Sequence, residues 1–192
     1  MKSAVALGFT LVAMRLRVAC FDPVVDSAAR ILILGSMPGE ASLSAGQYYA
    51  NARNTFWKIM GELIGLDPND PYERRLEALK AAGIALWDVL RSCHRKGSLD
   101  AAIEFDSIEV NDFDALFPKY PHIKMVCFNG ATAERCYKKH VLCKFKHTSI
   151  NHIRLPSTSP AHAALSLETK VAAWRAAFGA QQALQPWLPR GG

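Results

Sequence analysis

The stretch from Ile31 to Trp57, ILILGSMPGEASLSAGQYYANARNTFW, decides the fold and points to the functional site. Its first residues, Ile31 to Leu34, are all apolar and predict a buried strand, which stops at the Gly/Pro turn GSMPG (35–39). In open α/β sheets such turns lie at the carboxyl ends of parallel strands, where ligands bind. The aromatic and amide residues that follow the turn suit a flat ring. We therefore expect a binding site for a flat ring after this strand.

A second polar turn, LPSTSPAH (155–162), occurs much later in the chain. It follows the short apolar segment Ile150 to Leu155 and precedes a helical pattern. Because both turns follow predicted strands of one sheet, we expect them to face each other across one cleft.

Strands and helices alternate along the rest of the chain, which predicts an α/β domain with a mostly parallel sheet and helices on both faces. Residues 92–106 are expected to be mostly connection. We expect residues 1–25 to be an N-terminal extension, residues 26–183 one domain and residues 184–192 a tail, with either Met1 or Met14 as the start. The expected strands are 30–34, 83–89, 123–128 and 150–155, and the expected helices are 55–66, 72–82, 110–117, 131–140 and 165–183.

The balance of charge favours a polyanionic partner. The 192 residues carry a formal net charge of +6 with a pI near 9.2. The segment from Glu134 to Arg154, both included, holds six Lys and Arg residues, Lys144 and Lys146 among them, and one acid. This basic segment leads into the second turn, where neutralising phosphates would hold a duplex.

Cysteine usage indicates a reducing cytoplasm, because the five cysteines are odd in number and form no C-x-x-C pair. Cys136, His140, Cys143 and His147 could in principle hold zinc, but buried thiols beside surface histidines are the favoured interpretation. The apolar run Ser3 to Met14 is too short to span a bilayer, so we expect no membrane association.

Five motifs occur in a fixed order: GSMPG (35–39), YYANARNTFW (48–57), LWDV (86–89), FNG (128–130) and LPSTSPAHA (155–163). Together they resemble the uracil-DNA glycosylase superfamily, and most closely its hypoxanthine (deoxyinosine) branch, known as family six. The resemblance implies a three-layer αβα sandwich around a four-stranded parallel sheet. It also implies an enzyme that flips a damaged base out of DNA and hydrolyses the N-glycosidic bond.

The resemblance suggests which group activates water. Several branches carry an acidic or amide residue in the first motif, but the matching residue here is Met37, whose thioether cannot polarise water. In the hypoxanthine branch the catalytic group is an asparagine in Asn-x-Phe-Trp, matched here by Asn54. The resemblance thus implies that Asn54 orients water, with Asn51 as its rival. An asparagine before an apolar helix is also a typical cap, so this alternative stays open.

The same resemblance predicts the base pocket. Tyr49 matches the aromatic residue that stacks on the flipped base. For the adjacent Tyr48, the alternative is burial in the core. Asp88 and Asn129 end the second and third strands, where relatives contact the base, although a capping carboxylate and a simple turn residue are the alternatives. The first turn is expected to contribute Gly35, Ser36 and Met37.

In the second turn, Leu155 stands where the classical uracil enzymes hold a catalytic histidine. Leucine donates no hydrogen bond to a uracil anion, which suits a purine leaving group. The resemblance implies that Ser157, Thr158 and Ser159 clamp phosphates, and that Pro160 to Ala163, with His162 facing DNA, enter the minor groove. The alternative is a capped loop before a helix.

The resemblance implies a monofunctional DNA glycosylase that removes hypoxanthine, with uracil and xanthine as further candidates. Its expected substrate is double-stranded DNA, with single-stranded DNA as a further candidate. We expect a cytoplasmic monomer, nucleoid-associated in a prokaryote, that needs no metal or cofactor. The motifs contain no lysine, which argues against a Schiff-base lyase. A nucleoside or nucleotide hydrolase and a non-catalytic binder of damaged or single-stranded DNA are the alternatives.

Overall fold

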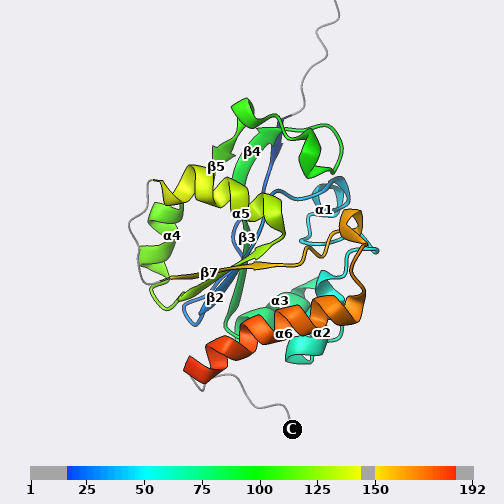
Figure 1. Ribbon diagram of the computed structural model, residues 1–192, viewed down its shortest axis with the longest axis vertical. Coiled ribbons are helices and arrows are strands. Elements are labelled where there is room, and N and C mark those ends of the chain that lie inside the picture. The colour runs from blue at the N-terminus through cyan, green and yellow to red at the C-terminus, as the bar shows by residue number, and fades with distance from the viewer. Residues whose placement is uncertain (1–16, 144–149, 185–192) are drawn as a thin grey trace, which may run out of the picture.

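A four-stranded sheet forms the centre of the protein in the computed structural model, which describes residues 17–143 and 150–184 (Figure 1). The strand order is β3-β2-β6-β7, and every neighbouring pair is parallel. This confirms the predicted sheet. The strands are β2 (Ile31–Gly35), β3 (Ile84–Asp88), β6 (Met125–Asn129) and β7 (Asn151–Leu155).

Strand β2 is buried along its whole length because helices cover both faces of the sheet. Ile31 and Ile33 pack with apolar residues of α2, α3 and α6, whereas Leu32 and Leu34 pack with those of α4 and α5. Figure 1 shows these helices on opposite sides of the sheet, which confirms the three-layer sandwich. These helices are α2 (Phe56–Ile64), α3 (Tyr72–Ala81), α4 (Phe113–Lys119), α5 (Ala131–Tyr137) and α6 (Leu167–Leu184). A further short helix, α1 (Glu40–Ala45), follows the first turn.

Helix ends differ from the predicted ones by a few residues. Helix α2 stops at Gly65, whose φ of 74° is left-handed and therefore favours glycine. Helix α5 gives way to a π-helix, Lys138–Leu142, which runs two residues past the predicted end at residue 140. None of the helices in the part of the chain described by the structure has the length and apolar character to cross a membrane.

A second, antiparallel sheet corrects two predictions. It has the order β1-β4-β5 and is formed by β1 (Arg17–Ala19), β4 (Leu90–His94) and β5 (Glu109–Val110). The end of the predicted extension therefore belongs to the fold, and residues 92–106 are more than a connection. The strand β1 is three residues long and pairs with a distant segment, so local periodicity gave no signal for it.

Candidate active site

The predicted cleft exists. One cavity of about 450 Å³ lies at the carboxyl ends of the parallel strands, between the two turns. It is lined by every residue predicted for the site except the two lysines. These residues are Gly35, Ser36, Met37, Tyr49, Asn51, Asn54, Asp88, Asn129, Ser157, Thr158, Ser159, Pro160 and His162.

Gly35 and Asp88 meet because they are register partners at the ends of β2 and β3. A Cβ atom on Gly35 would overlap Oδ1 of Asp88 and would lie 3.5 Å from the Tyr49 hydroxyl. The absence of a side chain at residue 35 therefore allows the Asp88 carboxyl to pack directly against β2.

The Tyr49 ring is held in place from two sides. It stacks on Phe56 with ring centroids 3.9 Å apart, and its hydroxyl accepts a hydrogen bond from Nδ2 of Asn129 at 3.2 Å. Its φ of 55° is unusual for a residue with a side chain, and surrounding contacts must hold it there. Tyr48 is buried in the core, as its alternative interpretation supposed.

Asn129 joins the Tyr49 loop to the second turn. Its Nδ2 also donates to Oγ1 of Thr158 at 2.8 Å, and its Oδ1 accepts from the Thr158 amide at 2.8 Å. These bonds make Asn129 a residue that positions Tyr49. They also correct the prediction for Thr158, whose side chain is 1% exposed and bonded to Asn129, so it does not reach a phosphate.

Both candidate asparagines line the cavity, and both make local backbone bonds. Oδ1 of Asn54 accepts from the Phe56 amide at 2.9 Å, and Oδ1 of Asn51 accepts from the Arg53 amide at 2.9 Å. The N-cap residue of α2 is Thr55, which makes no side-chain capping bond, so the capping prediction for Asn54 is wrong by one residue; Asn54 instead bonds the amide of the first helical residue. A carbonyl oxygen has two lone pairs, so this bond leaves one available to a water molecule.

Asp88 is 4% exposed, and its Oδ2 has no hydrogen-bond partner within residues 17–143 and 150–184. Burial, reinforced by the negative charge of Asp100 and opposed by Arg95, raises the pKa of Asp88 to about 8. The carboxyl group therefore retains its proton at neutral pH.

Sequence reasoning missed the loop after β4. Ser98, Leu99 and Asp100 line the cavity, and the Ser36 hydroxyl donates to Oδ1 of Asp100 at 2.7 Å. Arg95 donates to the carbonyl of Pro38 and so ties this loop to the first turn. The only available signal was general: polar connections of α/β folds often carry functional residues.

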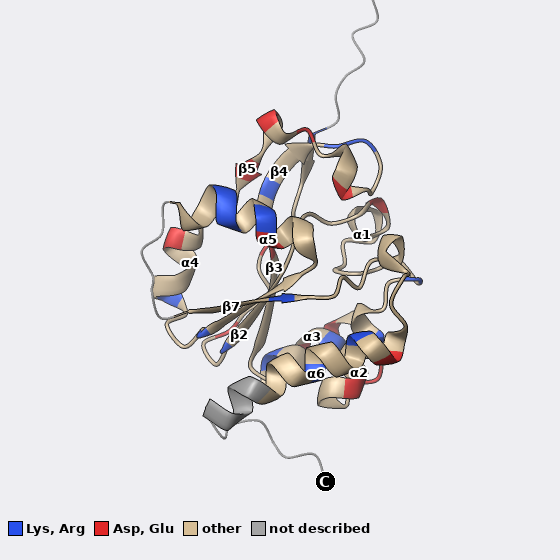
Figure 2. Ribbon diagram, in the orientation of Figure 1, with Lys and Arg blue, Asp and Glu red and all other residues tan. Residues whose placement is uncertain are grey.

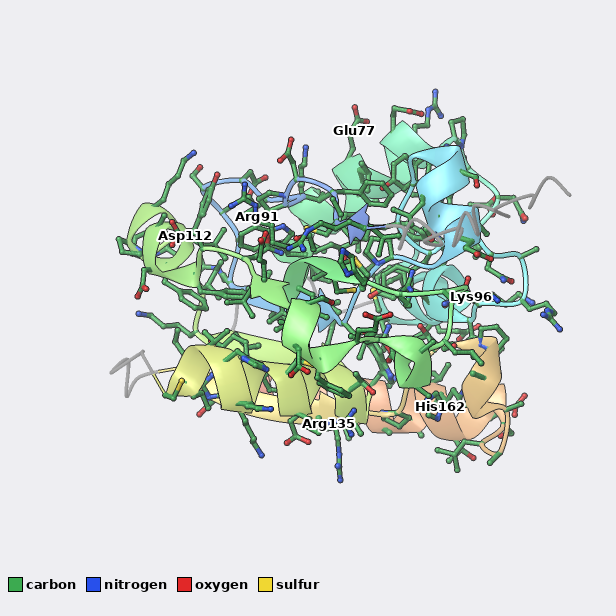
Figure 3. The ribbon with its side chains drawn as sticks, turned by 90° about the horizontal axis from the view of Figure 1, so that it is seen from above. Glu77, Arg91, Lys96, Asp112, Arg135 and His162 are labelled. Carbon is green, nitrogen blue, oxygen red and sulfur yellow. The ribbon has the colours of Figure 1, made fainter. Side chains whose placement is uncertain are left out.

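The second turn presents exposed polar groups at the edge of the cavity. His162 ends a 3-10 turn, Pro160–His162, and lies at the same end of the molecule as Lys96 (Figure 3). The Ser157 hydroxyl accepts from the Ser159 amide at 3.2 Å, which shapes the turn locally. Leu155 is 3% exposed, packs in the core and does not line this cavity.

The five motifs thus surround one cavity in a three-layer fold, and comparison with known proteins tests the resemblance. The family model described as "Uracil DNA glycosylase superfamily" matches residues 23–178. The chain belongs to this superfamily.

Relatives within the uracil DNA glycosylase superfamily are close in sequence and structure. A protein named hypoxanthine DNA glycosylase from Methanosarcina acetivorans is 37% identical over 159 residues, which is 82% of this chain and 96% of the relative. One of the same name from Methanosarcina barkeri is 44% identical over 111 residues, 57% of this chain and 69% of the relative. A solution NMR structure of an M. acetivorans protein proposed to be a uracil DNA glycosylase superposes with a TM-score of 0.69 and 33% identity, covering 84% of this chain and 98% of its own.

The structure describes part of the basic segment, which runs from residue 134 to residue 154. Figure 2 shows positive charge along α5 and its continuation, where Arg135 points outward in Figure 3. Glu134 pairs with Lys138 at 2.8 Å and with Arg154 at 3.3 Å, which neutralises part of that charge. Lys144 and Lys146 lie outside the described residues.

The candidate zinc cluster is also described in part. Cys136 is buried in the core, Cys143 is exposed, and His147 lies outside the described ranges. Among the residues that the structure describes, no group of three His, Cys, Asp or Glu side chains is arranged to hold a metal ion.

Proposed function

We propose that this protein is a monofunctional DNA glycosylase that hydrolyses the N-glycosidic bond of deaminated bases in DNA, chiefly hypoxanthine. The observation that carries the proposal is the cavity in which residues of all five motifs meet. Its volume of about 450 Å³ suits one flipped base with its sugar. The names of the two Methanosarcina relatives support hypoxanthine as the substrate.

Tyr49 provides the stacking surface. Phe56 covers one face of the ring, so the flipped base stacks on the other face. A base stacked on an aromatic side chain gains about 1–3 kcal/mol, and a two-ring purine covers more of the tyrosine than a pyrimidine does. Because Asn129 and Phe56 fix the ring before DNA binds, little side-chain entropy is lost on binding.

Asn54 orients the attacking water through the second lone pair of Oδ1, with Asn51 on the same loop as the alternative. A neutral amide is a weak base. The departing purine leaves an oxocarbenium-like sugar, however, which needs a well-placed nucleophile more than a strong one. The hydrogen bond to the Phe56 amide holds the Asn54 oxygen in position for this task.

The second turn and the basic segment hold the duplex. Ser157 and Ser159 offer hydroxyl and amide groups to phosphates, and the exposed Pro160–His162 turn faces the minor groove. Lys144 and Lys146 supply further charge. The protein acts as a monomer on double-stranded DNA and requires no metal or cofactor.

The test compares a deoxyinosine duplex, a deoxyuridine duplex and free deoxyinosine as substrates. We expect release of free hypoxanthine from the first and no hydrolysis of the free nucleoside. Hydrolysis of free deoxyinosine would indicate a nucleoside hydrolase. Tight binding to the lesion duplex without base release would indicate a non-catalytic binder.

A further inference from the structure

Asp88 lines the cavity and has one carboxyl oxygen without a hydrogen-bond partner among the described residues. It is the last residue of β3, and its Oδ1 packs against Gly35, where a Cβ atom would overlap it. The residue is 4% exposed, and the enclosed oxygen is Oδ2. An unpaired buried carboxylate would be costly, so these surroundings favour the neutral carboxylic acid, which lines the cavity where a ligand would lie.

The groups facing Asp88 from neighbouring elements favour its neutral form. Asp100 opposes its ionisation, while Arg95 lowers its pKa and also donates to the carbonyls of Pro38 and Gly97. Three further titratable groups lie close enough to Asp88 to interact with its charge: Tyr48, Tyr49 and Cys20. Burial raises the pKa of each of these three groups, so all three are neutral at pH 7.

A protonated carboxyl group differs chemically from the carboxylate that the sequence suggests. The acid has an O–H to donate and a carbonyl oxygen to accept, whereas the carboxylate only accepts. Hypoxanthine carries acceptors at N7 and O6, and its ring becomes more basic as the bond from N9 to the sugar breaks. An acid beside the ring can therefore assist departure of the base.

We propose that Asp88 is the general acid of this glycosylase and protonates N7 of the departing hypoxanthine. The inference rests on the proposed function. As the C1′–N9 bond breaks, its electron pair passes to the base and the Asp88 proton moves to N7, so hypoxanthine leaves as a neutral molecule. Water held by Asn54 forms the new bond to C1′, and the proton that this water loses passes to solvent or restores Asp88.

The experiment measures single-turnover release of hypoxanthine from a deoxyinosine duplex between pH 5.5 and 10, for the wild type and Asp88→Asn. The amide preserves shape and hydrogen bonding but holds no transferable proton. General acids contribute roughly 100-fold to 10,000-fold, so we expect a loss of at least about 100-fold at pH 6.5. The wild-type rate should fall tenfold per pH unit above a pKa near 8, while the variant's rate should stay flat over that range.

A second variant separates acid catalysis from a structural role. Asp100→Asn removes the negative charge that raises the pKa of Asp88, so the fall in rate should begin at lower pH. Carbon-13 NMR of the Asp88 carboxyl, assigned by its loss in Asp88→Asn, should show the same titration in the free protein. If Asp88 had only a structural role, the pH at which the rate begins to fall would not match the pKa of the carboxyl seen by NMR.

A wild-type rate that does not fall up to pH 10, or near-normal release by folded Asp88→Asn, overturns the acid role and leaves the proposed function standing. An Asp88 carboxyl that titrates near pH 4 also overturns it. A wild type that releases no hypoxanthine at any pH overturns both the inference and the proposed function.

Discussion

Substitution of Asn54 by alanine separates the local hydrogen bond of this side chain from its proposed role in positioning water. Oδ1 accepts from the Phe56 amide at the start of α2, and the residue lines the cavity. Loss of one such hydrogen bond costs about 1 kcal/mol of folding free energy. In a protein of 192 residues, that corresponds to a fall in melting temperature of about 2–4 °C.

The fall in catalytic rate, expressed as free energy, should be much larger than the loss of folding free energy. The rate is measured by base release, and the stability is measured by melting. We expect single-turnover release of hypoxanthine to fall by at least about 100-fold, which corresponds to about 2.7 kcal/mol in the transition state. Affinity for lesion DNA should change little, because the oriented water acts chiefly in the transition state.

Two matched variants complete this test. Asn54→Ser keeps a side-chain oxygen that can accept from the Phe56 amide but shortens the side chain, so it should melt near the wild-type temperature and still lose most activity. Asn51→Ala removes the hydrogen bond to the Arg53 amide and should cleave at a near-normal rate. If folded Asn54→Ala and Asn54→Ser cleave normally while Asn51→Ala does not, the assignment of Asn54 is wrong.

Three further predictions follow from the geometry of the cavity and the charge of the chain. In matched duplexes hypoxanthine should be released faster than uracil, because the Leu155 side chain is packed in the core and offers no donor to a uracil anion; faster uracil release would contradict this. Gly35→Ala should lose most hypoxanthine release, because its Cβ would displace the Asp88 carboxyl, and normal activity in the folded variant would show that the position of this carboxyl does not matter. Neutralising Lys144 and Lys146 together should flatten the dependence of log K on log salt by up to about 2 units if both contact phosphates, with the lesion preference unchanged; an unchanged slope with altered preference would refute an electrostatic role.

The sequence was sufficient to predict the central sheet and the placement of the site. Ile31 to Leu34 form an apolar run that no surface strand would carry, and the turn that follows must lie at the carboxyl edge of the sheet. Asp88 and Asn129 end neighbouring strands, so their presence in one cavity follows from the parallel topology.

What the sequence could not predict depends on contacts between distant residues. The pairing of β1 with β4 joins segments far apart in the chain, and it is this sheet that leads to Asp100 beside the first turn. The burial of Thr158 likewise depends on its bonds to Asn129. The neutral state of Asp88 follows from its depth and neighbours, which no local pattern records.

The most direct test of the central claim is the release of free hypoxanthine from a deoxyinosine duplex by the purified protein in excess EDTA. We expect full release under these conditions, and none when folded Asn54→Ala is used for the same short time. Absence of hypoxanthine from the wild-type reaction, or release that stops with EDTA and returns with zinc, would contradict it.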